Sequence, residues 1–153
     1  QFDKRYRRGL YHFIKRTVPP PSMLIFDASN RDQCEVKRSS TNTPLQSLVL
    51  MNDYQVLEAA RHLAIKTQKE KSSTEAKFEQ LFRKIVCRAP KPNEIKKIKD
   101  FHKETITAMD DKKAKEIIFF GDFKEAADMD IKGTAAMMQT VQLLFNLEET
   151  STR

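Results

Sequence analysis

The stretch TNTPLQSLVLMND, residues 41–53, decides how the fold is interpreted, because it starts a helix directly after the irregular residues 17–42. Thr43 is suited to be the N-cap, and Pro44 fits the first helical position, where a backbone N–H is not needed. Gln46 stands three residues after Thr43, which is the spacing of a capping box. The motif therefore predicts a helix with a fixed start.

This helix is expected to be short, because MNDYQVLEAARHLA, residues 51–64, contains a second start signal. Asn52 is the expected cap of the second helix, with Gln55 three residues later, and Met51 and Val56 are spaced as a hydrophobic staple. The predicted inner faces are Leu45, Leu48 and Val49 in the first helix and Val56, Leu57, Ala60, Leu63 and Ala64 in the second.

The rest of the chain also has a helical period. Amphipathic or apolar patterns predict further helices over residues 3–16, 78–86, 92–109 and 134–149, while residues 69–78 are expected to be a linker. The expected inward-facing residues include Leu10, Phe13 and Ile14 in the first of these helices and Phe78, Leu81 and Phe82 in the second. Gly121 is expected at a turn, and residues 126–130 are expected to form a single helical turn. The scarcity of glycine and of alternating β-branched runs disfavours a sandwich or barrel. We therefore expect an all-α protein: a single domain over residues 1–153, with five or six helices and one long ordered irregular loop at about residues 17–42.

The loop begins with three prolines, residues 19–21, for which polyproline conformation is expected. The apolar residues 23–26 that follow are expected to lie against the core. Mixed charges come next, and they suit a loop held by side-chain hydrogen bonds and Asp–Arg pairs. The candidate network or docking site is Asp27, Arg31, Cys34, Arg38 and Asn42.

The net charge of +7 and the basic residues 4–16 raise the question of anion binding. The candidate anion-binding residues are Arg5, Arg8, Lys15 and Arg16. A solvated face or internal salt bridges explain the same pattern, and nucleic-acid binding is disfavoured because no recognition motif accompanies the charge. No apolar run reaches the ~18 residues of a membrane span. The chain starts within helical material, so a larger parent protein is expected.

No pattern indicates catalysis, a metal or a cofactor. The histidines His12, His62 and His102 lie in three different predicted helices, and no glycine-rich phosphate loop or nucleophile motif is present. Cys34 and Cys87 have no metal-ligand or redox spacing. They could pair, but two free, mostly buried thiols are the simpler interpretation.

Several motifs resemble the planctomycete-associated PSD1 domain, the domain of unknown function numbered 1553. The matching elements are TVPPPSM at residues 17–23, FD at 26–27, Cys34 followed by Lys37 and Arg38, TNTPLQ at 41–46, ND at 52–53, EAAR at 58–61, R-x-P-x-P-x-E at 88–94 and NLEE at 146–149. Two departures are Lys37, where the family's C-x-x-R element has arginine, and Glu148, where it has aspartate.

The resemblance implies the C-terminal domain of a large bacterial envelope protein, periplasmic or outer-membrane-associated, often joined to a second uncharacterised domain and sometimes to a cytochrome c-like module. It implies no established activity, and this chain lacks haem-binding residues.

The leading hypothesis is a non-catalytic helical interaction domain that contacts the upstream domain of its own polypeptide or an envelope protein. In that case we expect an exposed apolar patch. One alternative is half of a composite enzyme or redox site, lined by Asp27, Arg31, Arg38 and Asn42. Another is an anionic-polysaccharide-binding module that uses the basic residues. It is equally open that the loop only completes the fold.

Overall fold

The structure, a computed structural model, describes residues 11, 13–15, 17–29, 36–37, 40–70, 72–121 and 129–151. Within these ranges it contains eight helices and no strand. They are α1 (Pro21–Ile25), α2 (Pro44–Asn52), α3 (Tyr54–Lys69), α4 (Thr74–Val86), α5 (Pro92–Ala108), α6 (Asp111–Ile118), α7 (Ile131–Phe145) and α8 (Glu148–Ser151). The all-α class is confirmed. The predicted number of helices was too low, because α1, α6 and α8 were not predicted; α1 and α8, with five and four residues, are too short to carry a clear period.

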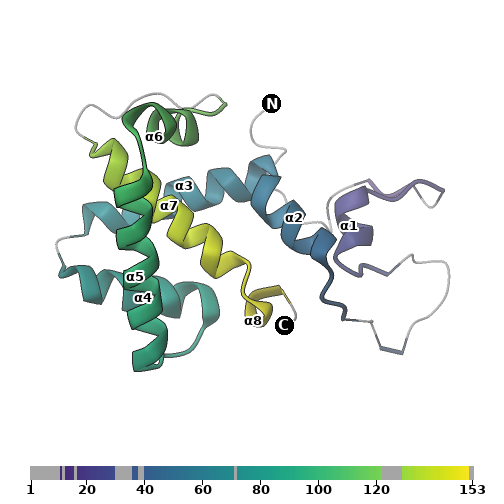
Figure 1. Ribbon diagram of the computed structural model, residues 1–153. Coiled ribbons are helices and arrows are strands. Elements are labelled where there is room, and N and C mark those ends of the chain that lie inside the picture. Colours follow the sequence, from purple (N-terminus) through teal and green to yellow (C-terminus); the bar gives the residue numbers. More distant parts are fainter. Residues whose placement is uncertain are drawn as a thin grey trace.

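The apolar helix α7 is the centre of the fold (Figure 1). It packs on α3, α5 and α6, and more lightly on α2, α4 and α8. A helix contacted on so many sides needs apolar residues around most of its circumference, which matches its sequence. The main core consists of Ala60, Ala64, Phe78, Leu81, Phe82, Val86, Ile98, Met137, Met138, Val141 and Leu144.

A smaller core joins α6 to the start of α7. It contains Met109, Ala114, Ile118 and Ala135. Asp130 caps α7, because its carboxylate accepts the backbone N–H of Gly133. The expected turn at Gly121 is confirmed by its φ of +70°. The helical turn predicted for residues 126–130 lies mostly outside the described residues.

The start of α2 is as predicted. The Thr43 hydroxyl accepts the Gln46 backbone N–H, the Gln46 side chain accepts the Thr43 backbone N–H, and Pro44 is the first helical residue. The predicted cap of α3 was wrong: Asp53 accepts the first N–H groups of α3, while Asn52 donates its side-chain amide to the Leu48 carbonyl. Aspartate competes well for this position because a carboxylate also interacts favourably with the helix dipole.

The connection between α3 and α4 is shorter than the predicted linker of residues 69–78. Ser73 caps α4, which begins at Thr74 and ends before Cys87 in the left-handed conformation. The predicted core positions Phe78, Leu81 and Phe82 are buried. Pro92 starts α5, as its sequence context indicated.

The predicted helix over residues 3–16 lies largely outside the described residues. Where it is described, Phe13 and Ile14 are not helical, and Phe13 is exposed rather than part of an inner face. The polyproline prediction fails at Pro21, which is the first residue of α1, although Pro20 has extended geometry. Proline is compatible both with polyproline conformation and with the first position of a helix, so the proline residues alone do not distinguish the two.

The segment around α1 lies at the edge of the molecule, beyond α2 (Figure 1). It packs on α2 rather than on the main core, and Leu24 and Phe26 remain exposed. The prediction that residues 23–26 lie against the core was therefore wrong. No helix in the described part of the chain is long and apolar enough to cross a membrane.

Candidate functional site

The predicted loop network is only partly described. Asp27 and Asn42 are placed, and Asn42 is exposed; Arg31, Cys34 and Arg38 lie outside the described residues. The carboxylate of Asp27 accepts both the backbone N–H and the hydroxyl of Thr41, each at 2.7 Å. These hydrogen bonds lower the pKa of Asp27. Asp27 thus joins the end of α1 to the start of α2.

The centre of this network is a residue missing from the candidate set, Gln46, which is 2% exposed. Its amide nitrogen donates to the Ile25 carbonyl at 2.8 Å and to the Thr41 hydroxyl at 3.2 Å, while its oxygen accepts the Thr43 N–H. One side chain therefore caps α2 and fixes the end of α1. The capping-box spacing identified Gln46 as a cap, but it contained no signal for the long-range bond to Ile25.

The candidate anion-binding set is mostly outside the described residues. Arg5, Arg8 and Arg16 are not described, and Lys15 is exposed. The backbone N–H of Val18 donates to the carbonyl of Lys15 at 3.1 Å. The described residues do not bring this set together.

The EAAR element of α3 places an arginine inside the protein. Arg61 is 1% exposed, and its guanidinium donates to the carbonyls of Ile118 at 3.0 Å and Phe120 at 2.8 Å. It also lies over the Phe120 ring, 4.4 Å from the centroid, and 3.8 Å from a carboxylate oxygen of Glu58. Arg61 satisfies carbonyls at the end of α6 that no helical N–H can reach, so its role is structural.

The motifs at residues 88–94 and 146–149 meet through one arginine. Arg88 binds the carboxylate of Glu94 with two nitrogens, at 2.7 and 2.9 Å, and that of Glu149 with two contacts, at 2.7 and 2.8 Å. Together with the N–H of Lys91, the guanidinium lowers the pKa of Glu94 to about 2. The clamp connects the α4–α5 turn to α8, and nothing in it resembles a catalytic pair.

The described histidines are not arranged for catalysis. His62 is exposed on α3, and His102 is buried in α5, where its Nδ1 is 3.1 Å from the hydroxyl of Thr140. That hydroxyl donates to the Ala136 carbonyl, so it accepts a hydrogen from Nδ1 of His102. Burial lowers the pKa of His102.

Cys87 is a free thiol, and Cys34 lies outside the described residues. The expectation that it is buried was wrong: it lies exposed at the C-cap of α4. Within the described ranges, no group of three or more His, Cys, Asp or Glu residues could hold a metal ion.

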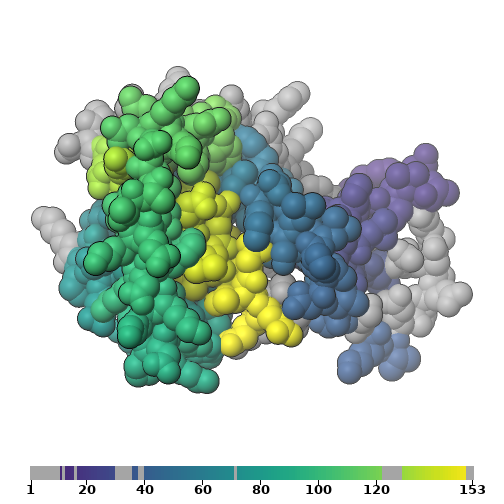
Figure 2. Space-filling model, viewed as in Figure 1, coloured from purple at the N-terminus to yellow at the C-terminus, as the bar shows by residue number. Residues whose placement is uncertain are grey.

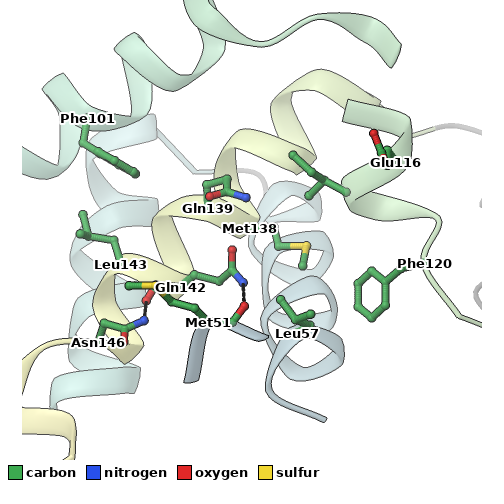
Figure 3. Close-up of a pocket in the computed structure, with 11 residues that line it drawn as sticks. Met51, Leu57, Phe101, Glu116, Phe120, Met138, Gln139, Gln142, Leu143 and Asn146 are labelled. Atoms are coloured by element: carbon green, nitrogen blue, oxygen red, sulfur yellow. Dashed lines mark hydrogen bonds between the residues drawn. The ribbon is translucent and has the colours of Figure 1, made fainter. Parts of the chain in front are cut away.

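The best candidate for a binding site is an apolar groove over α7. It lies between α5 and α6 on one side and α2 and α3 on the other (Figure 3). Its cavity has a volume of about 560 Å³, within the usual size of a binding pocket. Glu116 is the one charged side chain among the described residues that line it. The lining residues are Met51, Leu57, Phe101, Glu116, Ile117, Phe120, Met138, Gln139, Gln142, Leu143 and Asn146.

Apolar surface continues from the groove along α2. Met51 lines the groove, and Leu48 and Leu45 follow on the same helix at intervals of three residues; all three are about half exposed. Figure 2 shows the surface of α7 between α5 and α2, on the face where these helices come together. The prediction that Leu45 and Leu48 face inward was therefore wrong. We call the groove, together with the apolar surface of Leu45, Leu48 and Met51 on α2, the α7 groove.

Comparison with known proteins agrees with the motifs. A family model matches residues 1–102, and its description is "PSD1: Protein of unknown function (DUF1553)". The match includes the EAAR and R-x-P-x-P-x-E elements, while the NLEE element follows after it. No curated protein and no solved structure matches the chain. Because the family model covers more than half of the sequence, the chain belongs to the PSD1 family.

Proposed function

We propose that this chain is a non-catalytic docking domain, and that the α7 groove is the surface it uses. The observation that carries the proposal is the continuous apolar surface formed by the groove and by Leu45, Leu48 and Met51 of α2. Single exposed apolar residues are common, but a contiguous patch beside a preformed groove is typical of an interaction site.

The geometry of the groove favours binding over chemistry. Its described lining contains amides and one carboxylate, Glu116, and no nucleophile, histidine or cation among the lining side chains. General acid–base catalysis needs a positioned partner for such a carboxylate. A protein surface that excludes water needs only shape and apolar area, and both are present here.

The partner in this proposal is the polypeptide that precedes the domain in its parent protein. This choice rests on the family resemblance, which implies an exported, multidomain bacterial parent, sometimes with a cytochrome c-like module. The docking surface differs from the one expected from the sequence: the α7 groove carries the argument, and the segment of residues 17–42 supports it only by fixing α2 through Gln46.

The composite-site and anion-binding alternatives gain no specific support. Several of their residues lie outside the described ranges: for the composite site Arg31 and Arg38, and for the anion-binding set Arg5, Arg8 and Arg16. A composite site would also need a cleft lined by the loop charges. The described loop residue with a clear role is Asp27, whose carboxylate already accepts two hydrogen bonds from Thr41.

The test is titration calorimetry between this chain and the separately expressed preceding polypeptide at two salt concentrations. Apolar docking predicts association that persists at high salt, because screening acts on charges and not on apolar contacts. The informative variant is Leu143→Asp in the groove, and the matched control is Ile106→Asp. The two residues are 38% and 39% exposed and lie in the last turns of α7 and α5, but Ile106 does not line the groove.

We expect Leu143→Asp to weaken association about 10-fold or more, while Ile106→Asp leaves it unchanged. Circular dichroism and thermal unfolding of both variants confirm that they fold equally. Absence of association with the unmodified chain, or equal effects of the two substitutions, would rule out docking through the groove.

A further inference from the structure

The floor of the α7 groove is one uncovered face of a helix. Gln139, Gln142, Leu143 and Asn146 stand at positions i, i+3, i+4 and i+7 of α7, the spacing of a single helical stripe. Figure 3 shows Gln139 and Gln142 on this floor, with Met51 and Leu57 at one wall and Phe101 at the opposite side. Between Gly133 and Leu144, the α7 residues outside this stripe are buried by neighbouring helices, so in this part of α7 the stripe is the face that lacks a covering element among the described residues.

The charges around the groove are balanced. On α5, Lys97 and Glu104 lie one turn before and one turn after Phe101. On α6, Lys113 lies one turn before Ile117, next to Glu116 on the same side of the helix. The floor on α7 carries no charge, and Glu116 on the α6 wall is the one charge among the described lining residues. Two positive and two negative side chains thus stand along the α5 and α6 walls, so the complementary partner has an uncharged face toward α7 and mixed charges beside it.

The amides of the floor restrict the partner further. The side-chain nitrogen of Gln142 donates to the Met51 carbonyl at 3.5 Å, which leaves its oxygen as an acceptor beside the apolar lining (Figure 3). Covering this oxygen with a purely apolar surface would cost the hydrogen bond it makes to water. An amide or hydroxyl side chain opposite Gln142 avoids that cost, and a buried polar pair of this kind also fixes the register of packed helices.

We infer that the α7 groove receives an amphipathic helix of the partner, whose buried face is uncharged and carries one amide or hydroxyl side chain against Gln142. The inference rests on the proposed docking function and specifies the element that docks. A helix satisfies its own backbone N–H and C=O groups, whereas an extended segment would bring unpaired backbone groups into a lining with few polar atoms. The stripe from Gln139 to Asn146 is about 10 Å long, so about two turns of the docked helix make contact.

The first experiment is hydrogen exchange on the complex of this chain with the preceding polypeptide. It identifies the partner segment that becomes protected, and carbon chemical shifts of that segment report whether it is helical. Proline is then placed in the middle of the segment, with alanine at the same position as the control. We expect proline to abolish association and alanine to preserve it, because proline breaks a helix interior.

The second experiment is on this chain. Gln142→Glu places a charge on the floor of the groove, and Gln80→Glu, on the exposed surface of α4, adds the same charge elsewhere. We expect the first substitution to weaken association about 10-fold or more and the second to have no effect.

The outcomes separate the two proposals. Association that survives Gln142→Glu but is weakened by Leu143→Asp, or a protected partner segment that is extended and tolerates proline, overturns the docked helix while docking through the groove stands. Self-association of this chain that Gln142→Glu abolishes makes a second copy the occupant and also overturns it. Absence of any association overturns both proposals.

Discussion

In α4 the apolar residues Phe78 and Leu81 are buried, whereas in α2 the apolar residues Leu45 and Leu48 are exposed and the polar Gln46 is buried. The two helices are therefore held by different forces. Burial of apolar area, at roughly 25 cal/mol per Å², stabilises α4 in the bundle. The start of α2 is held by directional hydrogen bonds: the Gln46 side chain accepts the Thr43 N–H, and its amide donates to the Thr41 hydroxyl and to the Ile25 carbonyl of α1. The comparison shows that an apolar stripe in this protein is not always a core stripe.

The largest effect is expected where the bundle contains a charge. Arg61→Ala removes the donors for the carbonyls of Ile118 and Phe120 and the cation over the Phe120 ring. Each buried carbonyl left without a donor costs about 1–3 kcal/mol, so the free energy of unfolding should fall by about 2–6 kcal/mol.

Denaturant unfolding followed by circular dichroism measures the effect of Arg61→Ala. The control is Arg83→Ala, which removes an exposed ion pair to Glu79 and should cost no more than about 1 kcal/mol. Equal effects of the two substitutions would mean that Arg61 does not hold the end of α6.

Gln46→Ala tests whether hydrogen bonds hold α2. The substitution removes one half of the capping box and the bond to the Ile25 carbonyl, at a cost of about 1–2 kcal/mol. Hydrogen exchange should accelerate at the start of α2 and around α1 but not in α4. Uniform acceleration over all helices would show that α2 unfolds together with the bundle, and the contrast between the two regions would be lost.

The helical bundle was predictable from the sequence because its apolar residues follow the helical period and are buried on the face that this period predicts. Phe78, Leu81 and Phe82 are examples. The start of α2 was equally predictable, since a capping box is a local motif. The direction of Leu45 and Leu48 was not, because it depends on which surfaces α1, α3 and α7 leave uncovered. The α7 groove could not be predicted from the sequence for the same reason. Its residues come from five helices, and only the packing of these helices brings them together.

The buried histidine of the bundle provides a pH test. His102 has a lowered pKa in the folded protein because burial disfavours its charged form. The unfolded chain, with an ordinary histidine pKa of about 6.5, therefore binds more protons at acidic pH. Folding stability contributed by the neutral imidazole is present above about pH 6.5 and is lost as the pH falls below it.

Unfolding of the unmodified chain and of His102→Gln between about pH 7.5 and about pH 5.5, one unit either side of the ordinary histidine pKa, measures this effect. We expect the substitution to reduce the slope of stability against pH in this window. An unchanged slope in His102→Gln would mean that the buried imidazole is not the group that titrates.

The smallest effect on stability is expected for a substitution of Leu48. This substitution is the most direct test of the contrast between the exposed apolar residues of α2 and the buried ones of α4. Leu48 is 56% exposed on α2, so Leu48→Gln removes little buried area and should change the free energy of unfolding by no more than about 0.5 kcal/mol. If the stripe on α2 is a docking surface, the same substitution weakens association with the partner while thermal unfolding stays the same. A large loss of stability would instead place Leu48 inside the folded domain, and the apolar surface of α2 would then belong to the core like that of α4.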